Sequence, residues 1–489
     1  MNITFEQAKN FQNENKYSVL PLKREIFSDI ITPVQLLKVL MGVSEHCFIL
    51  ESAGDNEKRG RYTFIGYDPK LTVTCKDNNM KIVSADSVRA FVTENPDDYI
   101  RRILNENKSP FFSDMPSFTG GLVGYFAYDH IKYFEPSLKS ETNDSENFND
   151  LDLMLFDKVI AFDNFRQKII LIVNINLKND IEKEFSRADS EFEKIENLIR
   201  NFSPEKNFRG RLKSDFRQLF SEEVYCGMVK KAKEHIIDGD IFQIVLSNRL
   251  EADFEGSLLN TYRILRTLNP SPYMFYFSGS DIETAGASPE TLVKLQNGVL
   301  HTFPIAGTRP RGKTSEQDKN LEYELMRDPK ELAEHDMLVD LGRNDLGRIS
   351  KFGTVEVEKY HEILRFSHVM HIASTVRGVI RDDKDQLDAV NAVLPAGTLS
   401  GAPKIRACQL ISEIEGDKRG IYGGAVGYIS FNGNLDFCIA IRIAYKKNNK
   451  VFVRAGAGIV ADSVPENEYR ECLNKARAVV EALKASEAV

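Results

Sequence analysis

Several features are missing from this chain of 489 residues, and each absence narrows its class. No apolar run is long enough to span a bilayer, which argues against a transmembrane protein. The net charge is −8 and no block of Lys and Arg stands out, so a nucleic-acid or acidic-membrane partner is not expected. The opening segment 1–9 is polar and does not have the form of a signal peptide.

Cysteine is also sparse, with six residues and no Cys-x-x-Cys pair. This pattern fits reduced thiols, and we expect a cytoplasmic protein. The composition is 42% hydrophobic and 28% charged, which is ordinary for a soluble globular protein. The length exceeds one average domain and suffices for a large core.

The order of predicted elements divides the chain into three regions. Residues 15–178 are β-rich, 179–218 form a charged helix followed by a linker, and 219–485 form the region with most of the candidate site residues. Strands come in hairpin-like runs with helices between them. This favours an α+β fold with large antiparallel sheets flanked by helices over a doubly wound parallel sheet.

Some elements are predicted at positions that bear on the site. Thr32 and Pro33 have the pattern of a helix start. The periodicity predicts a helix over 322–341, a strand over 437–443, and a helix over 402–415 with Ser400 as its N-cap.

Two Glu-x-x-Glu pairs, Glu331 with Glu334 and Glu468 with Glu471, are the most informative motif. Residues three apart share one face of a helix, so each pair points two carboxylates in one direction. Most such pairs are solvated helix surface. If the two helices face each other, however, the four carboxylates form an all-oxygen site of the kind that suits Mg²⁺.

Two Gly-containing turns are candidates for ligand binding. Gly307 allows close approach of a ligand to the backbone, and Thr308 offers a hydroxyl, although an ordinary basic turn would look similar. Thr398 lies just before the predicted helix start at Ser400, where exposed N–H groups favour an anion; a plain capped helix is the alternative.

Small residues at 423–427 and 455–458 mark strands that a ligand or another backbone approaches closely. Tyr422 belongs to the same neighbourhood. Arg442 lies within an apolar run, so it needs an anionic partner, which is either a substrate carboxylate or an internal acidic side chain. His368 and His371 lie on opposite faces of a predicted strand, and one of them is a candidate for proton transfer.

Taken in order, several segments resemble the chorismate-utilising enzyme family, with most likeness to its anthranilate-forming branch. The likeness covers nearly the whole chain. It rests on the sequence at Pro304–Arg311, Glu331–His335, Leu338–Asp345, Ala396–Lys404, Gly423–Tyr428 and Ala455–Ser463, and in the N-terminal half on Ile49–Ser52 and Gly120–Asp129.

The resemblance implies that the enzyme converts chorismate and ammonia to anthranilate and pyruvate, the first step of tryptophan biosynthesis. It implies Mg²⁺ held by Glu334 and Glu471 and supported by Glu331 and Glu468. Glu290 would protonate the leaving hydroxyl, His371 would assist the second step, and Thr398 would help at the ring carboxylate. The implied substrate-binding residues are Gly307, Thr308, Tyr422, Arg442, Gly456, Ala457, Gly458 and Lys475.

The chain has no Gly-x-Cys-x-Gly turn of a glutamine amidotransferase. The resemblance therefore implies a separate glutamine amidotransferase subunit, in a heterotetramer, as the source of ammonia. It also implies feedback inhibition by tryptophan. The positions that match the inhibitor site are Glu51, Ser52, Pro272, Tyr273 and Met274.

Related activities remain as alternatives. Aminodeoxychorismate synthase component I typically has a nucleophilic Lys at the position of Ala306, and isochorismate synthases usually carry a Lys base near the position of Gln243. The presence of Ala306 and Gln243 in place of these Lys residues favours the anthranilate-forming branch. A catalytically silent, tryptophan-binding subunit is the third hypothesis.

Overall fold

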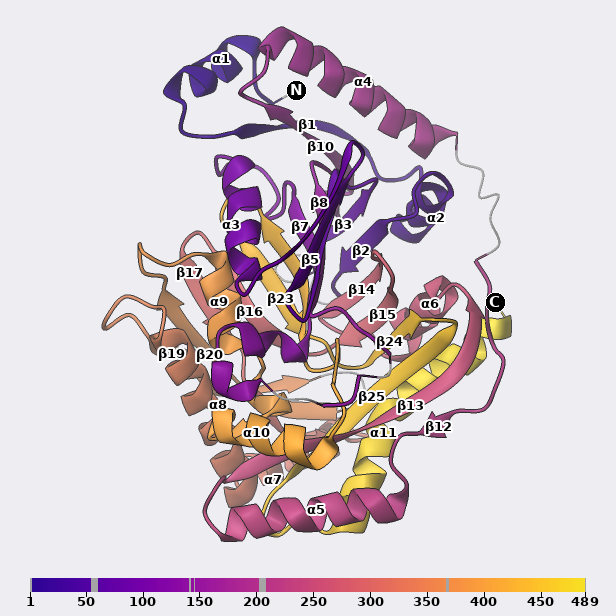
Figure 1. The fold of residues 1–489 in the computed structure, drawn as a ribbon, viewed down its shortest axis with the longest axis vertical. Coiled ribbons are helices and arrows are strands. Elements are labelled where there is room, and N and C mark those ends of the chain that lie inside the picture. The colour runs from indigo at the N-terminus through magenta and orange to yellow at the C-terminus, as the bar shows by residue number, and fades with distance from the viewer. Residues whose placement is uncertain are drawn as a thin grey trace.

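Two large antiparallel sheets lie face to face at the centre of the molecule (Figure 1). The structure is a computed structural model that describes residues 2–53, 60–139, 142–144, 146–201, 208–365 and 369–488. Helices cover the outer side of each sheet. The predicted α+β class with large antiparallel sheets is therefore confirmed.

The first sheet has thirteen strands among the described residues. In spatial order they are β1 (Val19–Phe27), β10 (Lys168–Asn176), β9 (Lys158–Asp163), β3 (Tyr62–Tyr67), β2 (Cys47–Glu51), β14 (Tyr273–Ser278), β15 (Glu283–Ser288), β24 (Ile443–Lys447), β25 (Lys450–Ile459), β13 (Gln243–Gly256) and β11 (Gly210–Leu212), with β12 (Arg217–Gln218) and β21 (Gly401–Ala402) also paired to β13.

The second sheet has twelve strands in the same described ranges. Their order is β18 (Ile305–Pro310), β20 (Val369–Val379), β17 (Val299–Thr302), β16 (Thr291–Gln296), β23 (Leu435–Ile439), β22 (Ala425–Ser430), β7 (Gly121–Phe126), β8 (Leu151–Phe156), β4 (Leu71–Lys76), β5 (Asn79–Ser84) and β6 (Ser87–Val92), with β19 (Glu356–Arg365) paired to β20.

Both sheets join strands from the first and third regions of the sequence. In the first sheet β2 pairs with β14, and in the second β22 pairs with β7. The regional division at 15–178, 179–218 and 219–485 remains a prediction about chain order, because hydrogen bonding runs across it.

The core has three principal parts, which follow from this layering. An aromatic-rich cluster between the sheets includes Phe48, Phe156, Phe275 and Tyr445. Outside the first sheet the main covering helices are α2 (Pro33–Val43), α4 (Ile181–Arg200), α5 (Glu222–Ile237), α6 (Leu259–Leu268), α10 (Lys404–Glu415) and α11 (Pro465–Ala485). Outside the second sheet they are α3 (Pro96–Glu106), α8 (Pro329–Gly347) and α9 (Gln386–Val393).

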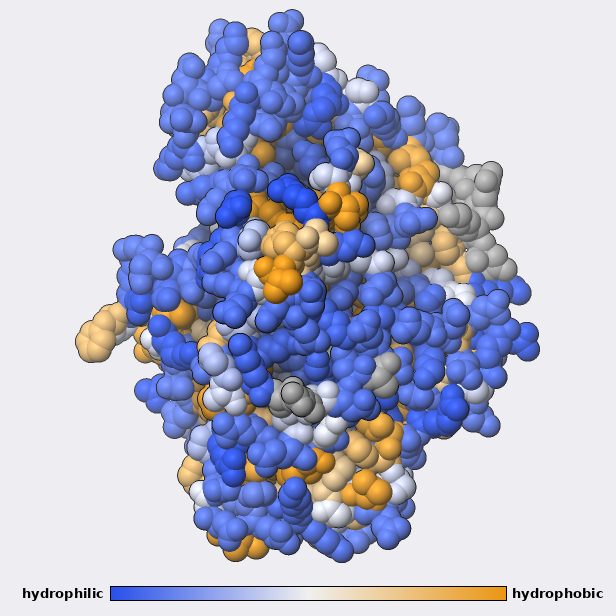
Figure 2. Space-filling view, viewed as in Figure 1, coloured by the Kyte–Doolittle hydropathy of each residue, from blue (hydrophilic) through white to orange (hydrophobic). Residues whose placement is uncertain are grey.

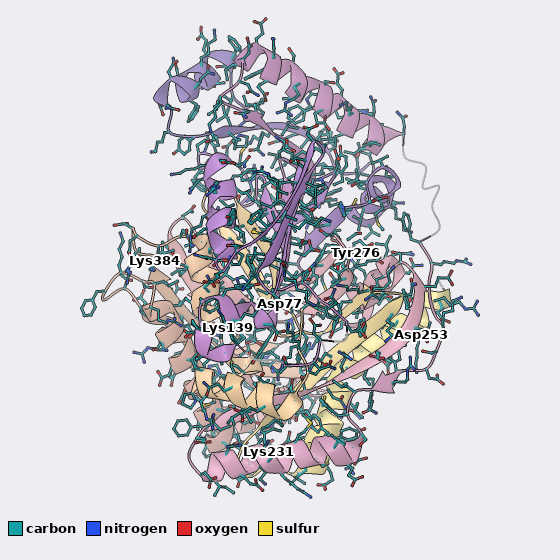
Figure 3. The ribbon with its side chains drawn as sticks, viewed as in Figure 1. Asp77, Lys139, Lys231, Asp253, Tyr276 and Lys384 are labelled. Atoms are coloured by element: carbon teal, nitrogen blue, oxygen red, sulfur yellow. The ribbon has the colours of Figure 1, made fainter. Side chains whose placement is uncertain are left out.

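The remaining helical elements are short or peripheral. They are α1 (Phe5–Glu14), α7 (Ser315–Leu325), η1 (Tyr128–Tyr133), η2 (Pro136–Leu138), η3 (Gly397–Leu399) and η4 (Ser486–Ala488). Figure 3 labels the fully buried Tyr276 of β14 near the middle of the molecule and the exposed Lys231 of α5 at its lower edge. The face in Figure 2 is largely hydrophilic, with apolar residues in separate small groups. No helix in the described ranges is long and apolar enough to cross a membrane.

Local sequence signals explain where several helices begin. Thr32 caps α2 with its side chain and Pro33 occupies the first turn, as predicted. The charged helix predicted in the linker region is α4. It is not simply exposed, because residues such as Ala188 and Phe192 bury one face against β10 and α1.

Two predictions of helix boundaries are wrong. The helix predicted over 322–341 is two helices, because Asp328 caps a new start and Pro329 occupies its first turn. The predicted N-cap at Ser400 is also wrong: α10 follows Pro403, and the Ser400 hydroxyl instead donates to the carbonyl of Ala396 at 2.8 Å.

The strand predicted over 437–443 is wrong in a way that matters for the site. β23 ends at Ile439 in the second sheet, and β24 begins at Ile443 in the first sheet. The chain therefore crosses between the sheets at 440–442. Arg442 has a φ of 52°, a left-handed conformation that non-glycine residues seldom adopt.

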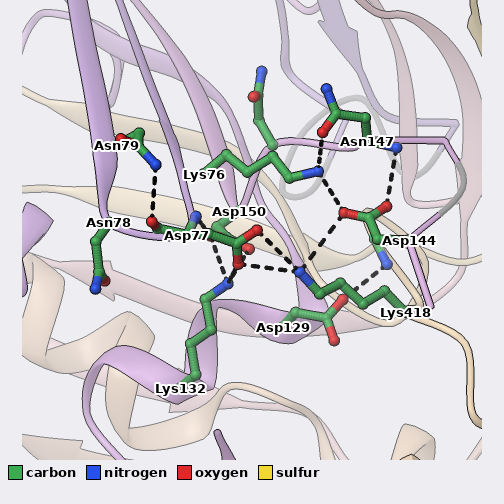
Figure 4. A network of polar contacts seen from close by, with 12 residues as sticks. Lys76, Asp77, Asn78, Asn79, Asp129, Lys132, Asp144, Asn147, Asp150 and Lys418 are labelled. Atoms are coloured by element: carbon green, nitrogen blue, oxygen red, sulfur yellow. Dashed lines mark hydrogen bonds and ion pairs between the residues drawn. The ribbon is translucent and has the colours of Figure 1, made fainter. Parts of the chain in front are cut away.

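A network of charges links the two halves of the chain (Figure 4). The Lys418 ammonium donates to Asp77 at 3.1 Å and lies 3.6 Å from Asp144. Lys132 bridges Asp77 and Asp150 at 2.6 and 2.8 Å. Residues that follow α10 are thereby attached to the N-terminal strands.

Gly427 lies on β22 of the second sheet, at a point where there is no space for a side chain. A Cβ built there would lie 2.0 Å from the carbonyl oxygen of Asp436 on the neighbouring strand. We expect Gly427→Ala to lower the free energy of unfolding by about 1–3 kcal/mol or more, because the sheet must separate. Denaturant unfolding with Gly227→Ala as control tests this: Gly227 is helical with open space around it, so that change should stabilise by up to about 1 kcal/mol. Equal effects of the two changes would contradict the expectation.

Candidate functional site

Glu290 and Arg442 lie on two adjacent passages of the chain between the sheets. One passage runs from β15 to β16 and carries Glu290; the other runs from β23 to β24 and carries Arg442. The Ile439 amide donates to the Glu290 carbonyl at 3.0 Å, and the Ala287 amide donates to the Arg442 carbonyl at 3.1 Å. These backbone bonds fix the two passages against each other.

Glu290 is a partly buried residue whose carboxyl group accepts a hydrogen bond from a neighbouring side chain. The Thr398 hydroxyl donates to its Oε1 at 3.1 Å. Burial raises the pKa of Glu290 to about 8, an effect that the Thr398 hydrogen bond and the charges of Arg442 and Lys475 only partly offset. At neutral pH the group is mostly protonated and can act as an acid.

Arg442 directs its positive charge toward the same space. Burial lowers the pKa of its guanidinium, and the carboxyl of Glu290 acts in the opposite sense. Within the described ranges, Arg442 has no side-chain ion pair closer than 4.0 Å. Of the two partners left open by the sequence, the geometry favours an external anion over an internal salt bridge.

His371 lies on β20 opposite Thr308 of the paired strand β18. Its Nδ1 lies 2.9 Å from the carbonyl of Gly307 and 3.0 Å from the hydroxyl of Thr308. Since a carbonyl only accepts, Nδ1 carries the hydrogen and the neutral ring has its lone pair on Nε2. Burial lowers the pKa of His371, which favours that neutral form. His368, the other candidate, lies outside the described residues.

Gly307 has a positive φ of 67°, which a side chain would strain. A Cβ there would also lie 3.1 Å from Oε2 of Glu331 on α8. The predicted turn at Gly307 is instead an irregularity within strand β18, and it lies close to the first Glu-x-x-Glu pair.

The small-residue strand β25 forms another wall of the site. A Cβ at Gly456 would lie 3.1 Å from the Tyr422 hydroxyl, and a Cβ at Gly458 would lie 2.9 Å from the amide nitrogen of Gln243. Ala457 between them is fully buried. Lys475 of α11 donates to the Gly456 carbonyl at 3.2 Å, which places its charge near this wall.

The two Glu-x-x-Glu pairs lie near each other on α8 and α11. Burial raises the pKa of Glu334, and the negative charges of Glu331 and Glu471 raise it further. Burial and the charge of Glu471 also raise the pKa of Glu468. The helices thus bring like charges together, a cost that a bound cation would relieve.

The same carboxylates also have protein partners. Glu471 forms an ion pair with Lys475 at 2.8 Å, and Glu331 forms one with Arg309 at 3.0 Å. In the ranges described, no group of three or more His, Cys, Asp or Glu is close enough to hold one metal ion. Carboxylate oxygens are nevertheless the donors that Mg²⁺ prefers.

The five residues matched to the inhibitor site line one cavity of about 960 Å³ between the sheets. The Glu51 carboxylate itself points toward α6, where Tyr262 and Arg266 bind it. Tyr273 donates to Asp436 at 2.8 Å and contacts the Thr291 hydroxyl at 2.9 Å. The cavity also borders Pro289 and Thr291, the two neighbours of Glu290.

Sequence reasoning missed several charged residues near the site. Arg309 binds both Asp328 and Glu331 at the start of α8. Glu415, Arg419 and Arg454 form a fully buried ionic cluster next to the wall at 456–458. The only available signal was the charged residue Arg454 inside the apolar strand β25.

Comparison with known proteins identifies the family. The family model for chorismate binding enzymes matches residues 45–481. The chain belongs to the chorismate-binding enzyme family. It is 45% identical to anthranilate synthase component 1 of Acetivibrio thermocellus, over 96% of this chain and 96% of that protein. It is 44% identical to anthranilate synthase component 1 of Aquifex aeolicus, over 100% of this chain and 99% of that protein.

Solved structures of this family share the two-sheet fold. Anthranilate synthase component I of Streptococcus pneumoniae TIGR4 is 34% identical, with a TM-score of 0.76 over 93% of this chain and 98% of that one. The menaquinone-specific isochorismate synthase of Escherichia coli has a TM-score of 0.70 at 19% identity, over 97% of this chain and 98% of that one, which shows the fold alone.

Glu290 should make the stability of this chorismate-binding enzyme fall as the pH rises. The unfolded chain ionises Glu290 near its ordinary pKa of 4.5, whereas the folded protein keeps the proton until about pH 8. Between these values the folded state binds more protons, so stability is lost with rising pH. Glu290→Gln should therefore gain in Tm relative to wild type between pH 5 and 9. Glu94→Gln, an exposed control, should show no such trend, and a constant difference for Glu290→Gln would contradict the burial argument.

Proposed function

We propose that the protein is the large subunit of an anthranilate synthase, a carbon–oxygen lyase that forms anthranilate and pyruvate from chorismate and ammonia. The observation that carries the proposal is the Glu290 carboxyl, which accepts a hydrogen bond from Thr398 and whose pKa is raised to about 8 although the charge of Arg442 acts to lower it. The anthranilate synthase names of relatives at 44 and 45% identity support it.

The proposed first step uses Glu290, Arg442 and Thr398, together with the residues that hold the ring. Arg442 binds the enolpyruvyl carboxylate of chorismate, and the walls at Gly307, Tyr422 and 456–458 hold the ring. Glu290 donates its proton to the C4 hydroxyl, which leaves as water while ammonia adds at C2. Thr398 orients the Glu290 carboxyl and helps at the ring carboxylate.

The second step is proton removal from C2 with loss of the enolpyruvyl group as pyruvate, which leaves the aromatic ring. His371 suits this step because its Nδ1 hydrogen donates to Gly307 and the lone pair lies on Nε2. Thr308 and Gly307 hold the imidazole in that orientation.

Glu334 and Glu471 are the proposed ligands of Mg²⁺, with Glu331 and Glu468 in support. The ion would offset the ring carboxylate charge and orient the substrate. Lys475, now paired with Glu471, would be available to the substrate side once the carboxylate turns to the metal.

Ammonia in the cell is proposed to come from a separate glutamine amidotransferase subunit in a heterotetramer. The names of the relatives as component 1 support a second component. We further propose a cytoplasmic location and feedback inhibition by tryptophan bound in the 960 Å³ cavity.

The other family activities fit the site less well. Ala306, on β18, has no nucleophile to offer to an aminodeoxychorismate-forming reaction. A silent tryptophan-binding subunit would not need Glu290, His371 and Arg442 at one site.

The test is product identity. Purified protein is incubated with chorismate, Mg²⁺ and an ammonium salt, and anthranilate is followed by its fluorescence. Appearance of anthranilate supports the proposal. Consumption of chorismate without anthranilate would instead indicate an aminodeoxychorismate or isochorismate activity, and no consumption would indicate the silent subunit.

Removal of either metal carboxylate should abolish Mg²⁺-dependent turnover. We expect Glu334→Gln and Glu471→Gln to reduce kcat/KM by about 100-fold or more, since ligand and support positions of metal sites are this sensitive. Calorimetry should show weakened Mg²⁺ binding in both. Glu481→Gln, exposed further along α11, is the matched control and should behave as wild type. Wild-type activity in the first two variants would refute the metal assignment.

The inhibitor proposal has a separate test. Ser52→Phe places a ring in the cavity and should raise the tryptophan Kd by about tenfold or more through steric exclusion, as measured by calorimetry. Ser87→Phe on the exposed strand β6 is the control. Unchanged tryptophan affinity in Ser52→Phe would place the inhibitor elsewhere.

A further inference from the structure

A buried ionic cluster lies next to the wall at 456–458 of β25. It is built from Glu415 at the end of α10, Arg419 just beyond it and Arg454 on β25. Their side chains are 0%, 1% and 0% exposed. Charges this deep are costly unless each is paired and hydrogen-bonded.

Glu415 satisfies that condition. Its carboxylate accepts hydrogen bonds from Arg419 at 2.6 and 2.9 Å and from Arg454 at 2.9 Å. It also accepts from the amide and hydroxyl of Ser247 at 2.7 and 2.9 Å. Burial acts to raise the pKa of Glu415, but the two guanidinium groups and these bonds hold it below its ordinary value.

Arg419 makes contacts that ionic pairing alone does not require. Its NH1 donates to the carbonyl of Leu399 at 2.6 Å, and its NH2 donates to the carbonyl of Val245 at 2.7 Å. The guanidinium carbon lies 4.7 Å from the ring centre of Tyr128 and 6.0 Å from that of Tyr422. One side chain thus contacts β13, the η3 turn and the Tyr422 loop.

The η3 turn is the element that presents Thr398 to Glu290. Leu399, whose carbonyl Arg419 binds, is the next residue after Thr398. The Val245 amide donates to the Ser400 carbonyl at 2.9 Å, so a main-chain hydrogen bond also attaches the end of the η3 turn to β13. A shift of the Leu399 carbonyl would move the Thr398 hydroxyl that lies 3.1 Å from Glu290.

We propose that Arg419 is a positioning residue for the proposed reaction: anchored by Glu415, it holds the η3 turn so that Thr398 remains bonded to the Glu290 carboxyl. The positioning role of Arg419 rests on the proposed function only because that function makes Glu290 the acid. The contacts themselves belong to the fold. A purely structural role would instead affect stability and leave the protonation of Glu290 unchanged.

The alkaline limb of the pH–rate profile separates these two roles. The groups that act on Glu290 are Thr398, Arg442 and Lys475, and the Thr398 bond lowers the pKa of Glu290. If the η3 turn loosens, the Thr398 hydrogen bond weakens and the pKa of Glu290 rises. The alkaline limb then moves to higher pH. The profile of kcat/KM reports the free enzyme, and it is measured at a constant concentration of free ammonia.

The experiment compares Arg419→Lys with Arg249→Lys. Lys keeps the charge but cannot reach both carbonyls and Glu415 at once. We expect Arg419→Lys to lower kcat/KM about tenfold or more and to shift the limb upward, toward the profile of Thr398→Val. Arg249 is also buried and binds Asp417 and Glu251, but its described side-chain hydrogen bonds do not reach 397–401, so Arg249→Lys should leave the limb in place.

Adding Arg419→Lys to Thr398→Val should produce no further shift, because the two residues act on Glu290 through one bond. If Arg419→Lys does not fold, the same profile is measured on Arg419→Gln combined with Glu415→Gln, which removes one charge of each sign. An unshifted limb in a folded variant, with wild type forming anthranilate, overturns the positioning role alone. Failure of the wild type to form anthranilate overturns the proposed function instead.

Discussion

Two side-by-side passages of the chain between the facing sheets determine the site. The passages at 288–291 and 439–443 each leave one sheet and enter the other, and main-chain hydrogen bonds at Ala287 and Ile439 hold them together. They place the carboxylic acid of Glu290 and the guanidinium cation of Arg442 in one space between the two sheets. The left-handed backbone at Arg442 costs about 1–3 kcal/mol, which the surrounding pairing must offset.

The chemistry of the site follows from burial, which raises the pKa of the acid Glu290 and lowers the pKa of the base His371. Burial favours the neutral form of Glu290 and the neutral form of His371, while Arg442 is a cation with no close ionic partner among the residues that the structure describes. Behind this layer the Glu415 cluster is fully paired. The molecule therefore separates charges that stabilise its own structure from charges that are available to a ligand.

Much of this arrangement could be predicted from the sequence, and the exceptions have physical reasons. The antiparallel sheets, the capped start at Thr32 and the grouping of Gly307, Thr308 and His371 follow from local patterns and motif likeness. The run 437–443 has uniform strand character, so nothing local shows that it changes sheets after Ile439. Arg419 lies in a polar-looking turn, and its burial arises only from long-range packing by β13, Tyr128 and Tyr422. Pro329 did carry a local signal for the break in the helix predicted over 322–341.

The cavity of about 960 Å³ between the sheets has a thermodynamic consequence beyond any regulation of turnover. Its walls come from both halves of the chain, from Leu50 and Phe64 on one side and Tyr428 and Cys438 on the other. Residues that border a void have fewer dispersion contacts than a packed core provides. A ligand that binds only the folded state at 100 times its Kd adds about 2.7 kcal/mol to stability. The lifetime of the protein against proteolysis would then depend on the concentration of whatever fills this space.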